Sequence, residues 1–219
     1  CRSCGLMVRF DPRTQAFAIS LSAVAGYVDA IGFLKLGGFF VSFMSGNSTR
    51  LAVGLVNGTP SATEAAGLIA GFVLGVMLGT GIGHIRPILR SRYVLLCITV
   101  LLGAAPLLDL YGFAVAALFA MTLAMRAENT IFAQNGEVRV GVTYMTGTLV
   151  KLGQGLMMSM LQRRSPPWWP YLALWLGLIG GAVTGANAYA HFGLQSLWLA
   201  AAVTAVLSII PATVLAPRN

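Results

Sequence analysis

Six apolar segments, each bounded by ionisable residues, constrain this chain more than any other feature of its sequence. They cover residues 14–34, 65–83, 93–108, 110–125, 165–190 and 192–217. Roughly 20 predominantly apolar residues are needed to cross a bilayer as a helix, and two of the segments (93–108 and 110–125) need flanking residues to reach that length. We therefore predict an all-α, polytopic membrane protein with six transmembrane helices. Residues 1–219 would form a single integral membrane domain, with the lipid bilayer as its partner.

The charge balance fits the same class of protein. Charged residues make up 9% of the chain, whereas about a quarter of the residues in an ordinary soluble domain are charged. The formal net charge is +8, and Lys and Arg in the loops of a polytopic protein mark its cytoplasmic side. We expect no nucleic-acid partner, because membrane orientation explains the excess of basic residues.

The chain repeats itself with an offset of 101 residues. "MSGNSTRLAVGL" at 44–55 aligns with "MTGTLVKLGQGL" at 145–156, and five of the 12 positions are identical. The preceding "GYVDAIGF" lies over "AENTIFAQ" at 127–134, and the glycines at 71, 75 and 79 align with those at 177, 181 and 185. We predict two repeats, residues 14–109 and residues 110–216.

Each repeat contains a polar-centred segment, and these segments admit two topologies. If they cross the bilayer, there are eight spans and the basic residues divide almost evenly between the two faces. If they enter and return on the same side, there are six spans, with ten arginines on one face and Lys35 and Asp109 on the other. The positive-inside rule favours the second arrangement. It makes the two three-helix repeats inverted, each with a broken or re-entrant helical segment, and it places both termini in the cytoplasm.

The polar centres are candidate binding sites. Irregular backbone at bilayer depth is tolerated where it is buried in protein or lines a wet cavity. The glycines at 37–38 permit a sharp turn, and Asn47 or Ser48 is expected to cap a short helix over residues 49–56. A helix start carries about half a positive charge and binds anions, so we expect two such starts to meet near the midplane. The candidate substrate-binding residues are Ser45, Gly46, Asn47, Thr49, Arg50, Thr146, Gly147, Thr148 and Lys151.

Charged residues within these apolar segments leave two interpretations open. Arg50 and Lys151 would either bind a substrate or serve as internal salt-bridge partners. Buried acids near cations form structural pairs, or they carry protons because burial favours their neutral form. Both interpretations apply to a second group at nearly matching places in the first and fourth predicted helices, namely Asp29, Arg126, Glu128 and Asn129.

Other patterns indicate packing more than chemistry. Glycine at every fourth residue from 67 to 83 predicts a smooth face for close helix contact, and a homodimer through the glycine-striped helices is a further option.

The sequence offers no metal site. His84 and His191 are expected on opposite faces of the membrane, too far apart to share a metal, and the pair Cys1 and Cys4 has no second cysteine pair to complete a site. We predict no metal and no cofactor. The sequence also has no HExxH, GxSxG or P-loop, so we do not expect an enzyme.

Two stretches carry a resemblance to a known family. "AGYVDAIGFLKLGGFFVSFMSGNSTRLAVGL" and "TYMTGTLVKLGQGL" resemble the YoaK-like family of small bacterial inner-membrane proteins, which carry a domain of unknown function. The similarity covers nearly the whole chain, and Glu128 departs from it by standing where the family pattern has an uncharged Gln. The resemblance implies a multi-pass protein of the bacterial inner membrane, and it implies no particular substrate or reaction.

We favour a secondary transporter or exporter of a small solute, with an anion as the candidate. Internal duplication and interrupted helices around a midplane site are typical of such transporters. A channel would use the same polar centre as a filter. A structural or assembly protein is the other alternative, and the glycine stripes are the best evidence for it.

Overall fold

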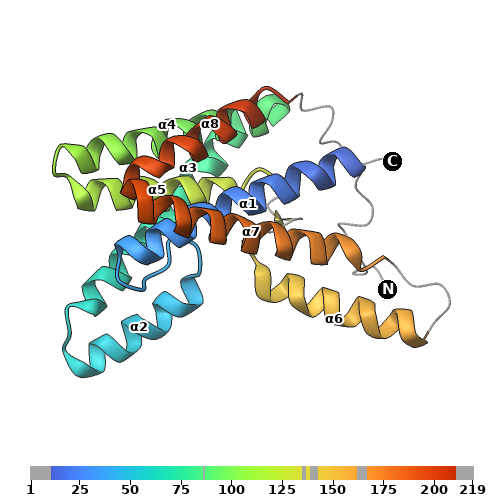
Figure 1. Cartoon of the computed structure of the whole chain (residues 1–219), viewed down its shortest axis with the longest axis horizontal. Coiled ribbons are helices and arrows are strands. Elements are labelled where there is room, and N and C mark those ends of the chain that lie inside the picture. Colours follow the sequence, from blue (N-terminus) through green and yellow to red (C-terminus); the bar gives the residue numbers. More distant parts are fainter. Residues whose placement is uncertain (1–10, 86, 135–136, 139–142, 162–166, 211–219) are drawn as a thin grey trace.

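The computed structural model describes residues 11–85, 87–134, 137–138, 143–161 and 167–210, and almost all of them are helical (Figure 1). The all-α class is confirmed, with one addition: two-residue strands β1 (Ala133–Gln134) and β2 (Glu137–Val138) pair in antiparallel fashion. The α-helices are α1 (Pro12–Lys35), α2 (Met44–Asn57), α3 (Ser61–Ile85), α4 (Arg90–Leu110), α5 (Ala114–Glu128), α6 (Met145–Leu161), α7 (Trp169–Phe192) and α8 (Leu197–Ser208), with short 3-10 helices η2 (Pro87–Leu89) and η3 (Gly193–Ser196).

Four segments of the described chain are long and apolar enough to cross a membrane. They are Pro12–Lys35, Ser61–Ile85, Pro87–Leu110 and Trp169–Ser208, the last of which joins α7, η3 and α8. The sequence predicted separate crossings for α5 and α8. At 1.5 Å per residue their 15 and 12 residues span only about 22 Å and 18 Å, against a hydrocarbon core of about 30 Å. Six complete crossings therefore remain a prediction.

The two short helices α2 and α6 differ from the long ones in their placement. In Figure 1 each begins near the middle of the molecule, below the crossing of α1 and α7, and runs outward to one end. α2 runs toward the end where α3 begins, and α6 runs toward the end where α7 begins. Each helix packs against the long helix that follows it, α2 on α3 and α6 on α7.

Close packing through glycine joins two pairs of helices, α1 with α7 and α3 with α5. Along α7, Gly177, Gly181 and Gly185 lie against the backbone of α1 at residues 19, 23 and 27. Along α3, the glycines at 71, 75 and 79 lie against α5 at residues 119, 123 and 127. The contacted positions in the two pairs differ by 100 residues at each step. For the first helices of the two repeats the offset is therefore 100 residues, one fewer than the 101 that the sequence suggested. With this offset Asp29 corresponds to Asn129.

These contacts bear on the homodimer that the sequence left open. The stripe at 71, 75 and 79 is covered by α5 of the same chain, so it is not free for a second copy. Gly67, Gly81 and Gly180 have no atom within 4 Å of where a Cβ would stand. A homodimer would have to use such outward positions.

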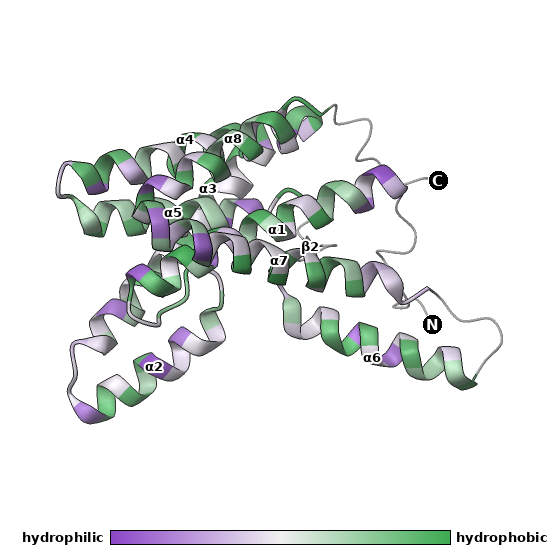
Figure 2. Ribbon diagram, in the orientation of Figure 1, coloured by the Kyte–Doolittle hydropathy of each residue, from purple (hydrophilic) through white to green (hydrophobic). Residues whose placement is uncertain are grey.

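The distribution of hydropathy fits a membrane protein with a polar centre. In Figure 2 the outer surfaces of α4, α7 and α8 are mainly hydrophobic, while hydrophilic residues cluster where the helices cross near the middle. Most of the apolar core lies between α1, α4, α5, α7 and α8. The buried polar side chains near the middle come from α1, α5 and the beginnings of α2 and α6.

Replacing Gly181 with Ala should destabilise the protein, because the new Cβ would overlap the backbone carbonyl of Ala23. Overpacking of this kind costs about 1–3 kcal/mol, so we expect a lower melting temperature in detergent. Gly180→Ala is the matched control on the same helix, since nothing lies within 4 Å of its Cβ position. Equal melting temperatures for the two variants would contradict the packing described here.

Candidate functional site

The site is built around a short non-helical segment, residues 39–43, which leads from α1 back into the molecule. α1 ends in a left-handed turn, with φ of 61° at Gly37 and 104° at Gly38. The N–H of Gly38 donates to the carbonyl of Phe33 at 2.8 Å, which is the helix-ending pattern that favours glycine. The sharp turn expected at these glycines is therefore present.

The helix that follows begins earlier than the sequence suggested. α2 starts at Met44 after Phe43, with no side-chain cap, and α6 starts at Met145. The expected start at Thr49, capped by Asn47 or Ser48, is wrong. Asn47 lies inside the first turn, and its side chain is turned back to the preceding segment instead of capping a helix. Gly46 and Gly147 are likewise helical, so neither polar centre breaks its helix.

The 39–43 segment has its backbone polar groups satisfied by three buried side chains. The Asn47 amide accepts from the Phe40 N–H at 3.2 Å and donates to the Phe40 carbonyl at 2.6 Å. Arg126 Nη2 donates to the Val41 carbonyl at 2.7 Å, and Asp29 accepts from the Ser42 N–H at 2.7 Å. The three side chains come from α2, α5 and α1, so the segment is held by three separate helices.

Arg126 occupies the middle of this arrangement. Its side chain is 0% exposed, and its guanidinium lies over the Phe72 ring, 4.5 Å from the centroid. Asp29 and Glu128 are near enough to act on it electrostatically, although neither acid forms an ion pair with it within 4.0 Å, and Tyr144 also lies nearby. Tyr144 directly precedes α6, while Val41 lies three residues before α2. Arg126 therefore lies between the starts of the two short helices.

A neutral hydrogen bond occurs at the corresponding place before α6. The Thr143 hydroxyl donates to the side-chain carbonyl of Asn129 at 2.9 Å, and both residues are buried. Asp29 and Ser42 lie 100 and 101 residues earlier in the chain, before α2, where the donor is the backbone N–H of Ser42 instead of a hydroxyl. The two positions therefore differ in charge, with a carboxylate before α2 and an amide before α6.

Glu128 is the buried acid without a hydrogen bond. Its side chain is 1% exposed, and neither Oε1 nor Oε2 has a hydrogen-bond partner among the described residues. Arg126 is near enough to act on it electrostatically. The four residues that the sequence grouped as ion-pair or proton-carrying candidates, namely Asp29, Arg126, Glu128 and Asn129, are thus all buried.

The predicted substrate-binding residues divide into buried and exposed sets. Asn47 and Thr148 are buried, and the Thr148 hydroxyl donates to the Tyr144 carbonyl at 3.3 Å. Gly46 faces the Phe40 ring, and nothing lies within 4 Å of the Cβ position of Gly147. The side chains that lie on the outside of the two short helices are Ser45, Thr49, Arg50, Thr146 and Lys151.

The two cations of the short helices do not meet at the centre. The Arg50 guanidinium lies over the Phe39 ring, 4.6 Å from its centroid, and close to Gly38 at the end of α1. Lys151 Nζ is 5.8 Å from the ring centroid of Tyr171, at the beginning of α7. Each side chain extends toward the end of the molecule at which its own helix finishes, as long basic side chains do near membrane interfaces. The positive charge near the helix starts belongs to Arg126 instead.

Comparison with known proteins places the chain in a family. A family model described as a protein of unknown function, DUF1275, matches residues 17–210. The chain belongs to this family. A UPF0700 transmembrane protein of Rhizobium meliloti (strain 1021) is 40% identical over 184 residues, which cover 84% of this chain and 80% of the relative. No solved structure matches this DUF1275 chain.

These matches confirm the resemblance to the YoaK-like family and support a membrane protein. The family description gives no activity, so the function of this DUF1275 protein has to be argued from its site. Residues 41 and 42 are the part of that site that the sequence did not suggest. They contribute backbone groups, and a backbone group that is bound by a side chain from a distant helix leaves no signal in residue type.

Asn47→Ala should loosen the 39–43 segment, because the N–H and carbonyl of Phe40 lose their partners. Each unsatisfied buried group costs about 1–3 kcal/mol, so we expect a lower melting temperature and faster amide hydrogen exchange at residues 39–43. Thr49→Ala is the control, since Thr49 is exposed and its hydroxyl bonds to the Ser45 carbonyl of its own helix. Unchanged exchange in the Asn47 variant would show that its side chain does not hold the segment.

Proposed function

We propose that this protein is a secondary transporter of a small anionic solute in the bacterial inner membrane, with its site where α2 and α6 begin beside Arg126. The position of Arg126 carries the proposal, since its guanidinium binds the backbone just before α2 and lies near Tyr144, the residue just before α6. The first turn of a helix presents N–H groups without intrahelical partners. Two such turns and a buried guanidinium favour an anion.

Two inverted repeats would account for the paired contacts. The contact between α1 and α7 corresponds to the contact between α5 and α3 when each helix is replaced by its counterpart in the other repeat. The packing of α2 on α3 corresponds in the same way to the packing of α6 on α7. α2 and α6 run from the middle toward opposite ends (Figure 1), as a two-fold axis in the membrane plane requires. This symmetry, with a midplane site between the repeats, is the common design of secondary transporters.

The same contacts suggest two bodies that move against each other. One body would contain α1, α6 and α7, and the other α2, α3 and α5. Each body would therefore combine the first helix of one repeat with two helices of the other repeat. α1 and α5 touch each other over a shorter stretch than either touches its glycine-rich partner. Asp29 projects from one of these two helices and Arg126 from the other. The buried charges therefore lie at the boundary along which alternating access would occur.

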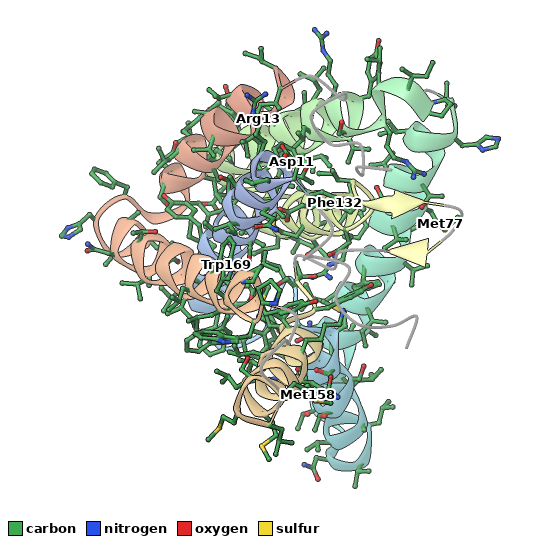
Figure 3. All side chains as sticks on the ribbon, turned by 90° about the vertical axis from the view of Figure 1, so that its right-hand side faces the viewer. Asp11, Arg13, Met77, Phe132, Met158 and Trp169 are labelled. Carbon is green, nitrogen blue, oxygen red and sulfur yellow. The ribbon has the colours of Figure 1, made fainter. Side chains whose placement is uncertain are left out.

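The charges at the two ends support the proposed orientation. Lys35 Nζ and Asp109 Oδ1 form an ion pair at 3.0 Å at the end where α1 and α4 finish. Arg13 lies at the opposite end, where α1 begins, which faces the viewer in Figure 3. Arg90 and Arg92 begin α4 at that same end. The positive-inside rule favours this end as the cytoplasmic one, and this supports the proposal that both termini are cytoplasmic.

Transport can be tested with purified protein in liposomes. The test measures exchange of radiolabelled chloride, nitrate, inorganic phosphate and oxalate, and we expect saturable movement of at least one of them. Arg126→Gln should weaken apparent affinity roughly 10- to 100-fold, since a charge-assisted hydrogen bond contributes about 1.5–3 kcal/mol. Arg92→Gln removes an exposed arginine and is the control.

Each other outcome excludes the proposal in a different way. Conductance without saturation would favour a channel through the same polar centre. Failure of all four anions to move in a folded, monodisperse preparation would favour a structural or assembly role. Equal affinity in the Arg126 and Arg92 variants would place the anion elsewhere.

The Lys35–Asp109 pair should act as a gate, because it links α1 to α4 while those two helices share few other contacts. The side chains are 28% and 24% exposed, so the pair can open to water. In a background lacking Cys1, Cys4 and Cys97, a bifunctional methanethiosulfonate cross-link between Lys35→Cys and Asp109→Cys should stop anion exchange, and reduction should restore it. Full exchange in the cross-linked double variant would contradict the gate, and Lys35→Cys alone, treated with the same reagent, is the control.

A further inference from the structure

Glu128 is placed differently from the other acids of helices α1, α3 and α4. Asp109 pairs with Lys35, Asp29 accepts a backbone N–H, and Glu64 is exposed at the start of α3. Glu128 is buried to 1% exposure, and both of its carboxyl oxygens lack a hydrogen-bond partner. Buried polar atoms are nearly always hydrogen-bonded in native proteins, so an unsatisfied carboxyl needs an explanation.

The side of α5 on which Glu128 lies is apolar. Residues spaced three or four apart share one face of a helix, so Glu128 follows Met125 and Met121 along α5. Both methionines are completely buried and belong to the apolar core. An ionised carboxylate without a partner is strongly disfavoured in such surroundings, whereas the neutral acid is tolerated.

Arg126 does not neutralise Glu128 by direct contact. Two residues apart on a helix, the two side chains leave opposite faces, and Arg126 is engaged by the Phe72 ring and the Val41 carbonyl. It is nevertheless the charged group that acts on Glu128. The other ionisable groups on the helices packed against α5 are Arg13, Tyr27, Asp29 and Lys35 on α1, Glu64 and His84 on α3, and Arg90, Arg92, Tyr93, Cys97 and Asp109 on α4.

We propose that Glu128 is a proton-binding site and that its proton is the one coupled to transport. The second half rests on the transporter function proposed above, whereas the first half does not. One proton joins the carboxylate to give the neutral acid, and the same proton leaves when the carboxylate forms again. With Glu128 neutral, the charge of Arg126 is less compensated and attracts an anion. One proton and one monovalent anion then move together without net charge.

Asp29 is the other buried acid that could carry the proton, but its hydrogen bond gives it a structural role. Its carboxylate accepts the N–H of Ser42 at 2.7 Å, so it has the backbone partner that Glu128 lacks. Asp29 is thus a positioning residue for the 39–43 segment. Sodium as the coupling ion would need several oxygen ligands around one carboxylate, and the infrared measurement below separates it from a proton.

Infrared spectroscopy of the purified protein tests proton binding without a known solute. At neutral pH the wild type should show the C=O stretch of a protonated carboxyl, and that band should be absent from Glu128→Gln and retained in Glu64→Gln. Gln has nearly the shape of the neutral acid, so the variant should fold, and an unchanged melting temperature would verify this. If Glu128→Gln instead loses an ionised-carboxylate band, with or without sodium, the proposal is overturned.

Coupling is tested in liposomes that contain a trapped pH-sensitive dye. For whichever of chloride, nitrate, phosphate or oxalate exchanges, an inward anion gradient should acidify the interior with the wild type. Glu128→Gln should still exchange the anion and should no longer acidify the interior. Equal acidification by the variant would remove Glu128 from coupling. If none of the four anions moves, the transporter proposal fails while the infrared result still decides proton binding.

Discussion

The structure depends on hydrogen bonds that satisfy a few backbone groups deep inside a membrane protein. A chain that leaves α1 and turns back exposes N–H and C=O groups where no water is available. Asn47, Arg126 and Asp29 supply the missing partners for residues 40–42. Without these side chains α2 could not begin in the middle of the molecule, and there would be no helix start beside Arg126. The two positions before α2 and α6 therefore matter more than the polar residues within those helices.

Charge distinguishes the two halves of this centre. Asp29 and Arg126 hold the backbone before α2, whereas Asn129 and Thr143 form a neutral contact before α6. By the 100-residue offset Arg126 matches Gly26, which lies against the backbone of α7 at Leu178. One half thus presents a smooth surface where the other half presents a cation. In the proposed transporter, this difference in charge would let the centre bind one solute while the two repeats move in related ways.

The sequence predicted the helical class, the membrane, the glycine packing faces and the turn at Gly37 and Gly38, because each depends on local composition or spacing. It misplaced the start of α2 because Asn47 was assigned to a local cap, and its real partner is the backbone of Phe40. It also placed Arg50 and Lys151 in the centre, although each reaches an aromatic ring toward its own end. Side chains that bind distant backbone leave no periodic pattern, so the role of Asp29 and the link from Arg126 to Val41 required the structure.

The distance between spin labels at Ser45 and Thr146 tests the central claim most directly. Both residues are exposed and lie in the first turns of α2 and α6, so labels should leave the fold intact. Because both helices begin in the middle of the molecule, the distance should be well under the roughly 30 Å thickness of the hydrocarbon core. A distance equal to that thickness or greater would place the two starts at opposite faces and contradict the account.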